Sequence, residues 1–326
     1  MLNKVVFAAL AGVLPFAGTA SAQPYPARAV TMIVPFAAGG PQDTIARLVG
    51  ARMSEILGQQ IVIENIGGAG GTTGSLRVKN AAPDGYTFVW ASVGTHAQSQ
   101  TLYKKPAYNA ADDFTAVAFV GETPIALTVR KDLPVKDLKE FVAYAKENQA
   151  KMSFGSAGAG SATHLGCVVL NMALGTNITH VPYRGTGPAM QDLHAGRLDF
   201  LCEIINTAKP HIDSGAIKAL AIMTKERSPV LPDLPTAAEQ GVPNLEAYTW
   251  SAAFLPKGTP ADVVKKLNEA IVQAIDTPGV KEKLEGMGVT VASADRRSPE
   301  YMAKFVRSEI EKWAGPIKAS GAQIDN

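Results

Sequence analysis

The sequence predicts an α/β protein built of two lobes that are joined by two crossing strands. Three observations support this fold class: β-prone segments alternate with amphipathic helical segments, the alternation occurs in two separate stretches, and long β-prone segments connect these stretches. The chain has 326 residues, which is more than one hydrophobic core usually supports. We therefore expect lobe 1 to comprise residues 23–122 and 248–326, and lobe 2 to comprise residues 123–247.

The first 22 residues have the order of a secretory signal peptide. Lys4 supplies a positive charge, residues 5–18 form an apolar run, and Ala20-Ser21-Ala22 provides a small-residue cleavage site. The apolar run is too short to anchor the chain in a bilayer. The alternative, a buried N-terminal helix, would carry a polar face that this segment lacks. We expect cleavage near Ala22 and a mature protein that works outside the cytoplasm, where its function can use neither ATP nor NAD(P)H.

In lobe 1 we expect a strand–helix–strand order, which produces parallel strands. Residues 30–34 are β-prone. A helix follows, with Ile45, Leu48 and Met53 on one apolar face and Gly58 at its C-terminal end. The predicted order continues with a strand at 61–63, a glycine-rich loop at 67–74, a helix to about residue 80, a turn at 83–85 and a strand at 86–91.

Residues 114–120 and 125–129 predict two consecutive strands that lead from lobe 1 into lobe 2. Lobe 2 repeats the alternation. Its predicted helices cover about 135–148, 161–174 and 188–195. One predicted strand ends near residue 156, and three more cover 178–182, 198–201 and 219–223. Residues 245–255 are β-prone and return the chain to lobe 1, where helices are expected at 260–275, 280–287 and 299–319.

The charge balance argues against two classes of partner. The 31 Lys and Arg residues nearly balance the 29 Asp and Glu residues, which leaves a net charge of +2. Nucleic-acid binding and binding to a membrane surface both need concentrated positive charge, so we expect neither.

The two cysteines, Cys167 and Cys202, allow two interpretations. In an oxidising compartment they can form a disulfide, or they can remain separate buried thiols that pack as small hydrophobic groups. No histidines stand at ligand spacing beside them, so we expect no metal site.

Two glycine-rich loops each follow a predicted strand and open a predicted helix, at residues 35–43 in lobe 1 and 155–163 in lobe 2. Glycine and alanine let a ligand approach the backbone, and free N–H groups at a helix N-terminus attract an anion such as a carboxylate or phosphate. The hydroxyl groups of Ser156, Ser161 and Thr163 can add donors. Either loop alone can also be an ordinary strand-to-helix turn. One such loop in each lobe favours a shared site in a cleft between the lobes.

Nucleotide-binding and catalytic motifs are absent from the sequence. The glycine-rich segment 67–72 lacks the spacing of a dinucleotide fingerprint, and no Gly-Lys-Ser/Thr triplet occurs, so we expect no cofactor and a structural role for this segment. No His-Glu-x-x-His occurs, and Phe154 replaces the first glycine of a Gly-x-Ser-x-Gly elbow. We expect no catalytic residue, since a hydrolase that uses Ser156 or Ser161 would need a base constellation that the sequence does not offer.

Several polar residues at strand ends are further candidates for the cleft. Ser92 and Thr95 follow the strand that ends at residue 91, and Arg184 and Thr186 follow the strand at 178–182. Arg184 can pair with a ligand carboxylate or form a salt bridge at the rim. Asp43, in the first turn of its helix, either favours the helix dipole or orders the anion-binding loop.

Three other candidates carry equally open alternatives. His164 lies beside the second loop and either faces the cleft or has a structural role at the helix start. Glu203, at a strand end, is either an acceptor for a ligand amine, a hinge contact or a solvated carboxylate. Trp250, on the returning strand, either stacks on a ligand or packs in the core.

Many short segments, each weakly specific, occur in one order along nearly the whole chain after the signal peptide. They are Pro35-Phe36-Ala37-Ala38-Gly39-Gly40-Pro41-Gln42-Asp43, Ala46-Arg47, Leu57-Gly58-Gln59, Val62-Ile63-Glu64-Asn65, Gly68-Ala69-Gly70-Gly71, Ala82-Pro83-Asp84-Gly85-Tyr86-Thr87, Gly155-Ser156-Ala157-Gly158, His180-Val181-Pro182-Tyr183-Arg184-Gly185, Asp192-Leu193, Ala195-Gly196, Leu231-Pro232-Asp233-Leu234-Pro235-Thr236 and Pro256-Lys257-Gly258-Thr259-Pro260. Through them the sequence resembles the Bug family, the periplasmic solute receptors of tripartite tricarboxylate transporters.

The resemblance implies a type II-like periplasmic binding protein fold, in which a deep cleft captures a small carboxylate and delivers it to the membrane permease subunits. It implies that loop backbone groups and bridging waters hold one carboxylate, without a dedicated arginine. In this chain the role falls to Phe36, Ala37, Ala38, Gly39, Gly40 and Asp43, and on the other lobe to Ser156, Ala157, Gly158, Gly160, Ser161 and Thr163. Both cysteine positions are cysteine in a subset of the family, which supports the disulfide. Pro41-Gln42 departs from the family pattern and can change ligand preference.

The identity of the ligand stays open at this stage. A tricarboxylate, a C4–C5 dicarboxylate, an amino acid and an aromatic carboxylate are all compatible with the motifs. Trp250 and the modest charge of the candidate loops favour a mono- or dicarboxylate, either aromatic or not. We expect a monomer that serves transport; a ligand-binding partner of a periplasmic sensor would have the same fold.

Overall fold

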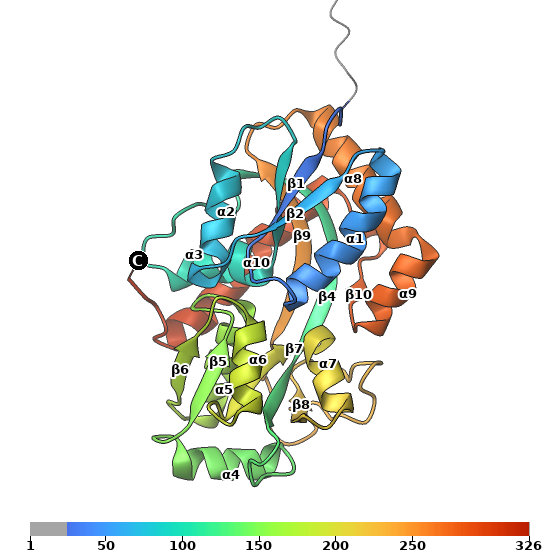
Figure 1. Ribbon diagram of the computed structural model, residues 1–326. Helices are drawn as coiled ribbons and strands as arrows, with labels where there is room; N and C mark the ends of the chain where they lie inside the picture. The colour runs from blue at the N-terminus through green and yellow to red at the C-terminus, as the bar shows by residue number, and fades with distance from the viewer. Residues whose placement is uncertain (1–24, 326) are drawn as a thin grey trace, which may run out of the picture.

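The computed structural model describes residues 25–325, which form two lobes along one mixed sheet (Figure 1). The predicted signal peptide, residues 1–22, lies outside the described residues. In the described part the sheet has ten strands, with the main order β2-β1-β3-β9-β4-β7-β5-β6, while β8 and β10 both pair with β4. The predicted α/β fold of two lobes is confirmed.

Lobe 1 has the predicted parallel arrangement, because β1 pairs in parallel with both β2 and β3. The helices of this lobe pack on the sheet through an apolar face. In helix α8, for example, Val264, Leu267 and Ile271 recur at helical spacing and are buried against the sheet. The elements of this lobe are β1 (Val30–Val34), α1 (Pro41–Leu57), β2 (Ile61–Asn65), the short helix η1 (Ala69–Gly71), α2 (Thr72–Lys79), β3 (Thr87–Ala91), α8 (Ala261–Asp276), α9 (Pro278–Gly286), β10 (Thr290–Val291), the short helix η3 (Ala294–Arg296) and α10 (Pro299–Ala319).

Lobe 2 repeats the pattern, since β5 pairs in parallel with β6 and β7. Asp137 caps α4 through a hydrogen bond from the backbone N–H of Glu140, and Ser161 caps α5 in the same way through His164. Its elements are α4 (Leu138–Asn148), β5 (Ser153–Ser156), α5 (Ala162–Leu174), β6 (Thr179–Pro182), α6 (Thr186–His194), β7 (Phe200–Ile204), α7 (Ile205–Asp213) and β8 (Ile217–Ile222).

Two strands run between the lobes, β4 (Phe114–Arg130) and β9 (Tyr248–Pro256) (Figure 1). The prediction of two consecutive strands at 114–120 and 125–129 is wrong, because β4 is one continuous strand. Antiparallel pairing with β9 keeps residues 121–124 extended up to Pro124, and from Ile125 onward β4 pairs with β7. The exact lobe boundaries at 122 and 247 remain predictions.

Among the described residues, two helical segments longer than three residues were not predicted. Residues 94–102 form a π-helical turn, η2 (Gly94–Gln98), followed by α3 (Ser99–Leu102). The polar residues Gln98 and Ser99 are buried there, so the segment lacks the apolar periodicity that marks a helix in sequence. Helix α7 follows β7 directly and contains Pro210. Because proline is disfavoured inside a helix, the sequence of this segment did not indicate one.

The predicted disulfide is present and joins Cys167 on α5 to Cys202 on β7, with the two Cα atoms 5.4 Å apart. It fixes α5 against the sheet of lobe 2. The N-terminus of this helix lines a cavity between the lobes.

Candidate ligand-binding site

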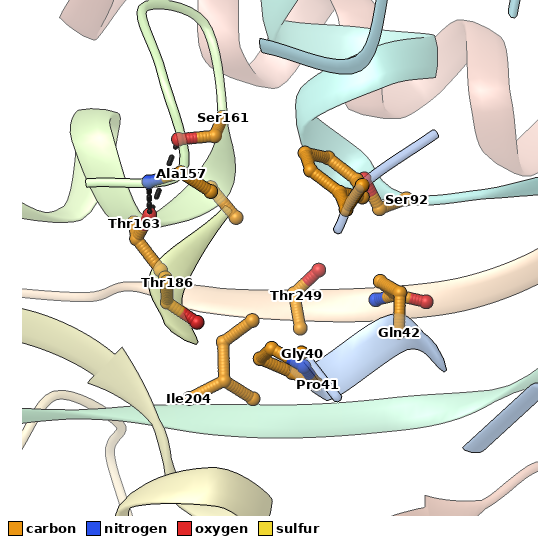
Figure 2. A pocket seen from close by; sticks show the side chains of 12 residues that line it. Gly40, Pro41, Gln42, Ser92, Ala157, Ser161, Thr163, Thr186, Ile204 and Thr249 are labelled. Atoms are coloured by element: carbon orange, nitrogen blue, oxygen red, sulfur yellow. Dashed lines mark hydrogen bonds between the residues drawn. The ribbon is translucent and has the colours of Figure 1, made fainter. Parts of the chain in front are cut away.

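A cavity lies where the two predicted loops meet (Figure 2). Residues of lobe 1 face residues of lobe 2 across it, with Thr249 of β9 between them. Its empty space totals about 350 Å³, but only about 20 Å³ can hold the centre of a water molecule, so this conformation has room for about one water. The lining residues are Phe36, Gly40, Pro41, Gln42, Ser92, Ala157, Ser161, Ala162, Thr163, Thr186, Ile204 and Thr249.

Three helices begin at this cavity. Pro41 and Gln42 are the first residues of α1, Ala162 and Thr163 are the first of α5, and Thr186 is the first of α6. The N–H groups of a first helical turn have no partner within the helix, and the helix dipole places partial positive charge there. Among the described residues that line the cavity, none has a charged side chain. The arrangement suits an anion held by backbone groups.

Asp43 orders the first loop from within helix α1. Its carboxylate accepts hydrogen bonds from the backbone N–H of Gly39 (2.8 Å), from Arg47 Nε (2.8 Å) and from Asn65 Nδ2 (2.8 Å). Burial alone would raise the pKa of Asp43, but the hydrogen bonds from Arg47, Gly39 and Asn65 outweigh burial and lower the pKa below its ordinary value. Asp43 is therefore an ionised residue that holds the loop, which is one of its two predicted roles.

Internal hydrogen bonds hold the second loop. Thr163 Oγ1 accepts a hydrogen bond from the N–H of Ala157 (3.0 Å), and Ser161 Oγ donates to the carbonyl of Gly158 (2.7 Å). Ser156 Oγ accepts from the N–H of Gly158 (3.0 Å) and lies 2.6 Å from His180 Nε2.

Ser156 and His180 form a serine–histidine pair that sequence reasoning missed. Ser156 is fully buried and does not line the cavity. The pair therefore lacks access to a substrate, which a nucleophile needs. Its contacts order the loop instead.

Ser92 contributes the hydroxyl that points most clearly to a ligand. It lines the cavity, only 2% of the residue is exposed, and its Oγ has no hydrogen-bond partner. A buried polar atom without a partner is rare in folded proteins. Figure 2 shows Ser92 facing the second loop across the cavity.

Gln42 and Thr249 were missed as lining residues. The side chain of Gln42 is held by β9, since its Oε1 accepts from Ser251 Oγ (2.9 Å) and its Nε2 donates to the carbonyl of Trp250 (3.4 Å). Gln42 lies within the first loop, where the sequence marked it only as a departure from the family pattern, and Thr249 lies in neither loop. A lining residue on the returning strand becomes visible only once the lobes are assembled.

Several predicted site residues lie outside the cavity. Trp250 is fully buried and donates from Nε1 to Glu309 (3.1 Å), so it packs in the core and does not reach a ligand. Arg184 is exposed, and Ala38 and Gly39 are exposed at the surface of the first loop. His164 accepts a hydrogen bond from the N–H of Gly160 (3.2 Å), a structural role.

The remaining predicted residues support their neighbours. Thr95 Oγ1 accepts from the N–H of Ser92 (3.0 Å). Glu203 is fully buried, which rules out the solvated alternative, and burial raises its pKa to about 7. It lines a neighbouring groove together with Thr186.

The two lobes touch around the cavity. The N–H of Ala37 donates to the carbonyl of Arg184 (3.3 Å), and Asn206 Nδ2 donates to the carbonyl of Pro41 (2.9 Å) and to Thr44 Oγ1 (3.1 Å). Because these contacts join the start of α1 to α6 and α7, they couple the approach of the lobes to the geometry of the site.

Two buried histidines whose rings are in contact, His164 and His180, predict an acid-labile fold. Burial lowers the pKa of His180 to about 4, and burial together with His180 lowers the pKa of His164 to about 3; their rings are 4.1 Å apart. Since both values lie below the ordinary 6.5, the unfolded chain takes up protons first. The stability that the neutral histidines contribute is present above pH 6.5 and is lost as the pH falls toward 4.

We expect chemical denaturation of the wild type to show this loss between pH 6.5 and 4. His180→Gln keeps an acceptor for Ser156 and should show a smaller loss over the same interval. Equal pH dependence in the two proteins would contradict this role for His180.

A match to a protein-family model shows which family this chain belongs to. Residues 45–322 match the family model described as the tripartite tricarboxylate transporter family receptor. The chain belongs to this receptor family. BugT of Bordetella pertussis is 34% identical over 98% of this chain and 96% of its own length. The family consists of solute-binding receptors, and the predicted family resemblance is confirmed.

Two solved structures of such receptors carry ligands. MatC from Rhodopseudomonas palustris, with bound malate, is 43% identical with a TM-score of 0.88, over 90% of this chain and 100% of that chain. A second R. palustris protein, with adipate, is 35% identical with a TM-score of 0.87, over 91% of this chain and 98% of that chain. In the present chain, residues 25–325 contain no helix with the length and apolarity to cross a membrane.

Proposed function

We propose that this chain is a periplasmic receptor that captures a small dicarboxylate between its lobes and delivers it to the permease subunits of a tripartite tricarboxylate transporter. The observation that carries the proposal is the convergence of three helix N-termini on a buried cavity without charged side chains. Such a site binds a carboxylate through N–H groups and helix dipoles. The malate and adipate held by two similar receptors are both dicarboxylates.

The narrow cavity indicates how the ligand would enter. Room for about one water is too little for a dicarboxylate, so the lobes must separate before binding and close around the ligand, as hinged receptors do. A useful receptor binds with a Kd of about 1 μM, or about 8 kcal/mol. Several charge-assisted hydrogen bonds inside a closed site can supply that free energy.

Titration calorimetry with succinate, malate and adipate, with glucose as the neutral control, tests the proposal. We expect at least one dicarboxylate to bind near the micromolar range and glucose not to bind. Binding of glucose in the absence of dicarboxylate binding would overturn the ligand class.

Ser92→Ala tests the position of the site. Removal of a hydroxyl that bonds a carboxylate should cost about 1–1.5 kcal/mol, or about tenfold in Kd. Ser228→Ala is a matched control, because Ser228 is also buried with an unpartnered Oγ but lines a different pocket. Equal effects of the two substitutions on Kd would place the ligand elsewhere.

A further inference from the structure

A second groove adjoins the cavity at the boundary between the lobes. It is lined by Gly39 and Thr44 of lobe 1 and by Thr186, Glu203 and Asn206 of lobe 2. Thr186 lines both spaces.

The chain itself shows how close the two spaces are. Gly39 lines the groove and Gly40 the cavity, and Thr186 at the start of α6 lines both. A small ligand bound in the cavity therefore has the groove directly beside it.

Two buried oxygen atoms in this groove lack hydrogen-bond partners. Glu203 is fully buried; its Oε1 accepts from Thr207 Oγ1 (2.7 Å), but its Oε2 has no partner. Asn206 uses its amide nitrogen for the contacts with Pro41 and Thr44, and its buried Oδ1 has no partner. Both atoms can accept hydrogen bonds, and leaving a buried acceptor unpaired is costly.

We propose that Glu203 and Asn206 form a subsite that accepts hydrogen bonds from a hydroxyl or ammonium group on the carboxylate ligand. The inference rests on the proposed function and deepens it, because it names a substrate class: small dicarboxylates that carry a hydrogen-bond donor beside the bound carboxylate. A ligand without that donor leaves both oxygens unpaired when the lobes close. The subsite thus selects between ligands of the same length.

The subsite is also joined to the contact between the lobes. Asn206 would accept from the ligand through Oδ1 while its Nδ2 donates across the lobes to Pro41 and Thr44. A ligand hydrogen bond to Oδ1 holds this amide in the orientation that bridges α7 and α1. Recognition of the donor group then favours closure.

Three ligands with the same four-carbon skeleton test the subsite: succinate, which has no donor, malate, which adds a hydroxyl, and free aspartate, which adds an ammonium. Calorimetry on the wild type should show malate or aspartate binding at least about tenfold more tightly than succinate. Whichever ligand is preferred identifies the donor group.

Variants separate recognition from structure. Glu203→Leu should weaken the binding of malate or aspartate and leave the Kd for succinate almost unchanged. The preference for a ligand with a donor group would thereby be lost. Glu203→Gln keeps an acceptor oxygen but cannot ionise, so it should retain a preference for malate and lose one for aspartate. Gln191→Ala, an exposed residue of the same groove, is the matched control and should leave all three Kd values unchanged.

Two results would overturn the inference alone: equal wild-type affinities for the three ligands, or an equal loss for all three in Glu203→Leu. Either would leave an internal water as the partner of the two oxygens, while succinate binding would still support the proposed function. If none of the three bound, while the Tm showed a folded protein, the proposed function would fail and the inference with it.

Discussion

Gly94→Ala should weaken dicarboxylate binding by roughly 5- to 150-fold while the protein stays folded. A Cβ at Gly94, on η2, would lie 2.9 Å from the backbone nitrogen of Ala162, 2.9 Å from the carbonyl oxygen of Gly160 and 3.1 Å from the Cα of Ser161. All three atoms belong to the second loop and the start of α5. The added methyl therefore acts as a wedge between the lobes, and overpacking of this kind costs about 1–3 kcal/mol.

Calorimetry with malate and small-angle scattering together measure this effect. Gly94→Ala should give a weaker Kd and a smaller ligand-induced decrease in the radius of gyration. Gly315→Ala is the control, because a Cβ there meets nothing within 4 Å and alanine favours the surrounding helix α10. Wild-type affinity in Gly94→Ala would show that the lobes need not approach this closely to bind ligand.

Asp43→Ala should lower the free energy of unfolding by about 3 kcal/mol and weaken ligand binding at least tenfold. The substitution removes the acceptor for Gly39, Arg47 and Asn65 from a position where only 2% of the residue is exposed. Hydrogen bonds to a charged group contribute about 1.5–3 kcal/mol, and buried donors left unpaired add to the loss. The first loop would lose the contact that fixes its last turn before α1.

Arg47→Ala provides the matched control for Asp43→Ala. The side chain of Arg47 is 52% exposed, so its ion pair with Asp43 should contribute less than about 1 kcal/mol. Urea denaturation and calorimetry on both variants separate the two roles. If Arg47→Ala lowered stability and ligand affinity as much as Asp43→Ala does, the ion pair, and not the ordering of the first loop, would explain the effect of Asp43→Ala.

The sequence predicted the fold where the pattern is local and failed where pairing is distant. Strands β1 and β2 and helix α10 follow from apolar periodicity and turn residues, and α10 was predicted at its observed bounds. The continuity of β4 through Pro124 depends on pairing with β9, more than a hundred residues away, so no local signal could show it.

The candidate site was predicted in part for the same reason. Phe36, Gly40, Ala157, Ser161 and Thr163 lie in loops whose glycine content marks them, and the structure brings them to one cavity. The contacts and the burial of individual side chains could not be predicted from the sequence. Nothing in the sequence shows that Trp250 is held by Glu309 in the core, that His180 meets Ser156, or that Glu203 is fully buried.

A crystal structure of the protein with malate tests the central claim most directly. We predict that one carboxylate lies between the first turns of α1, α5 and α6, with its oxygens about 3 Å from backbone N–H groups and from Ser92 Oγ. No arginine or lysine nitrogen should lie within about 4 Å of that carboxylate. A carboxylate paired with a cationic side chain, or malate bound outside the cavity, would contradict the account.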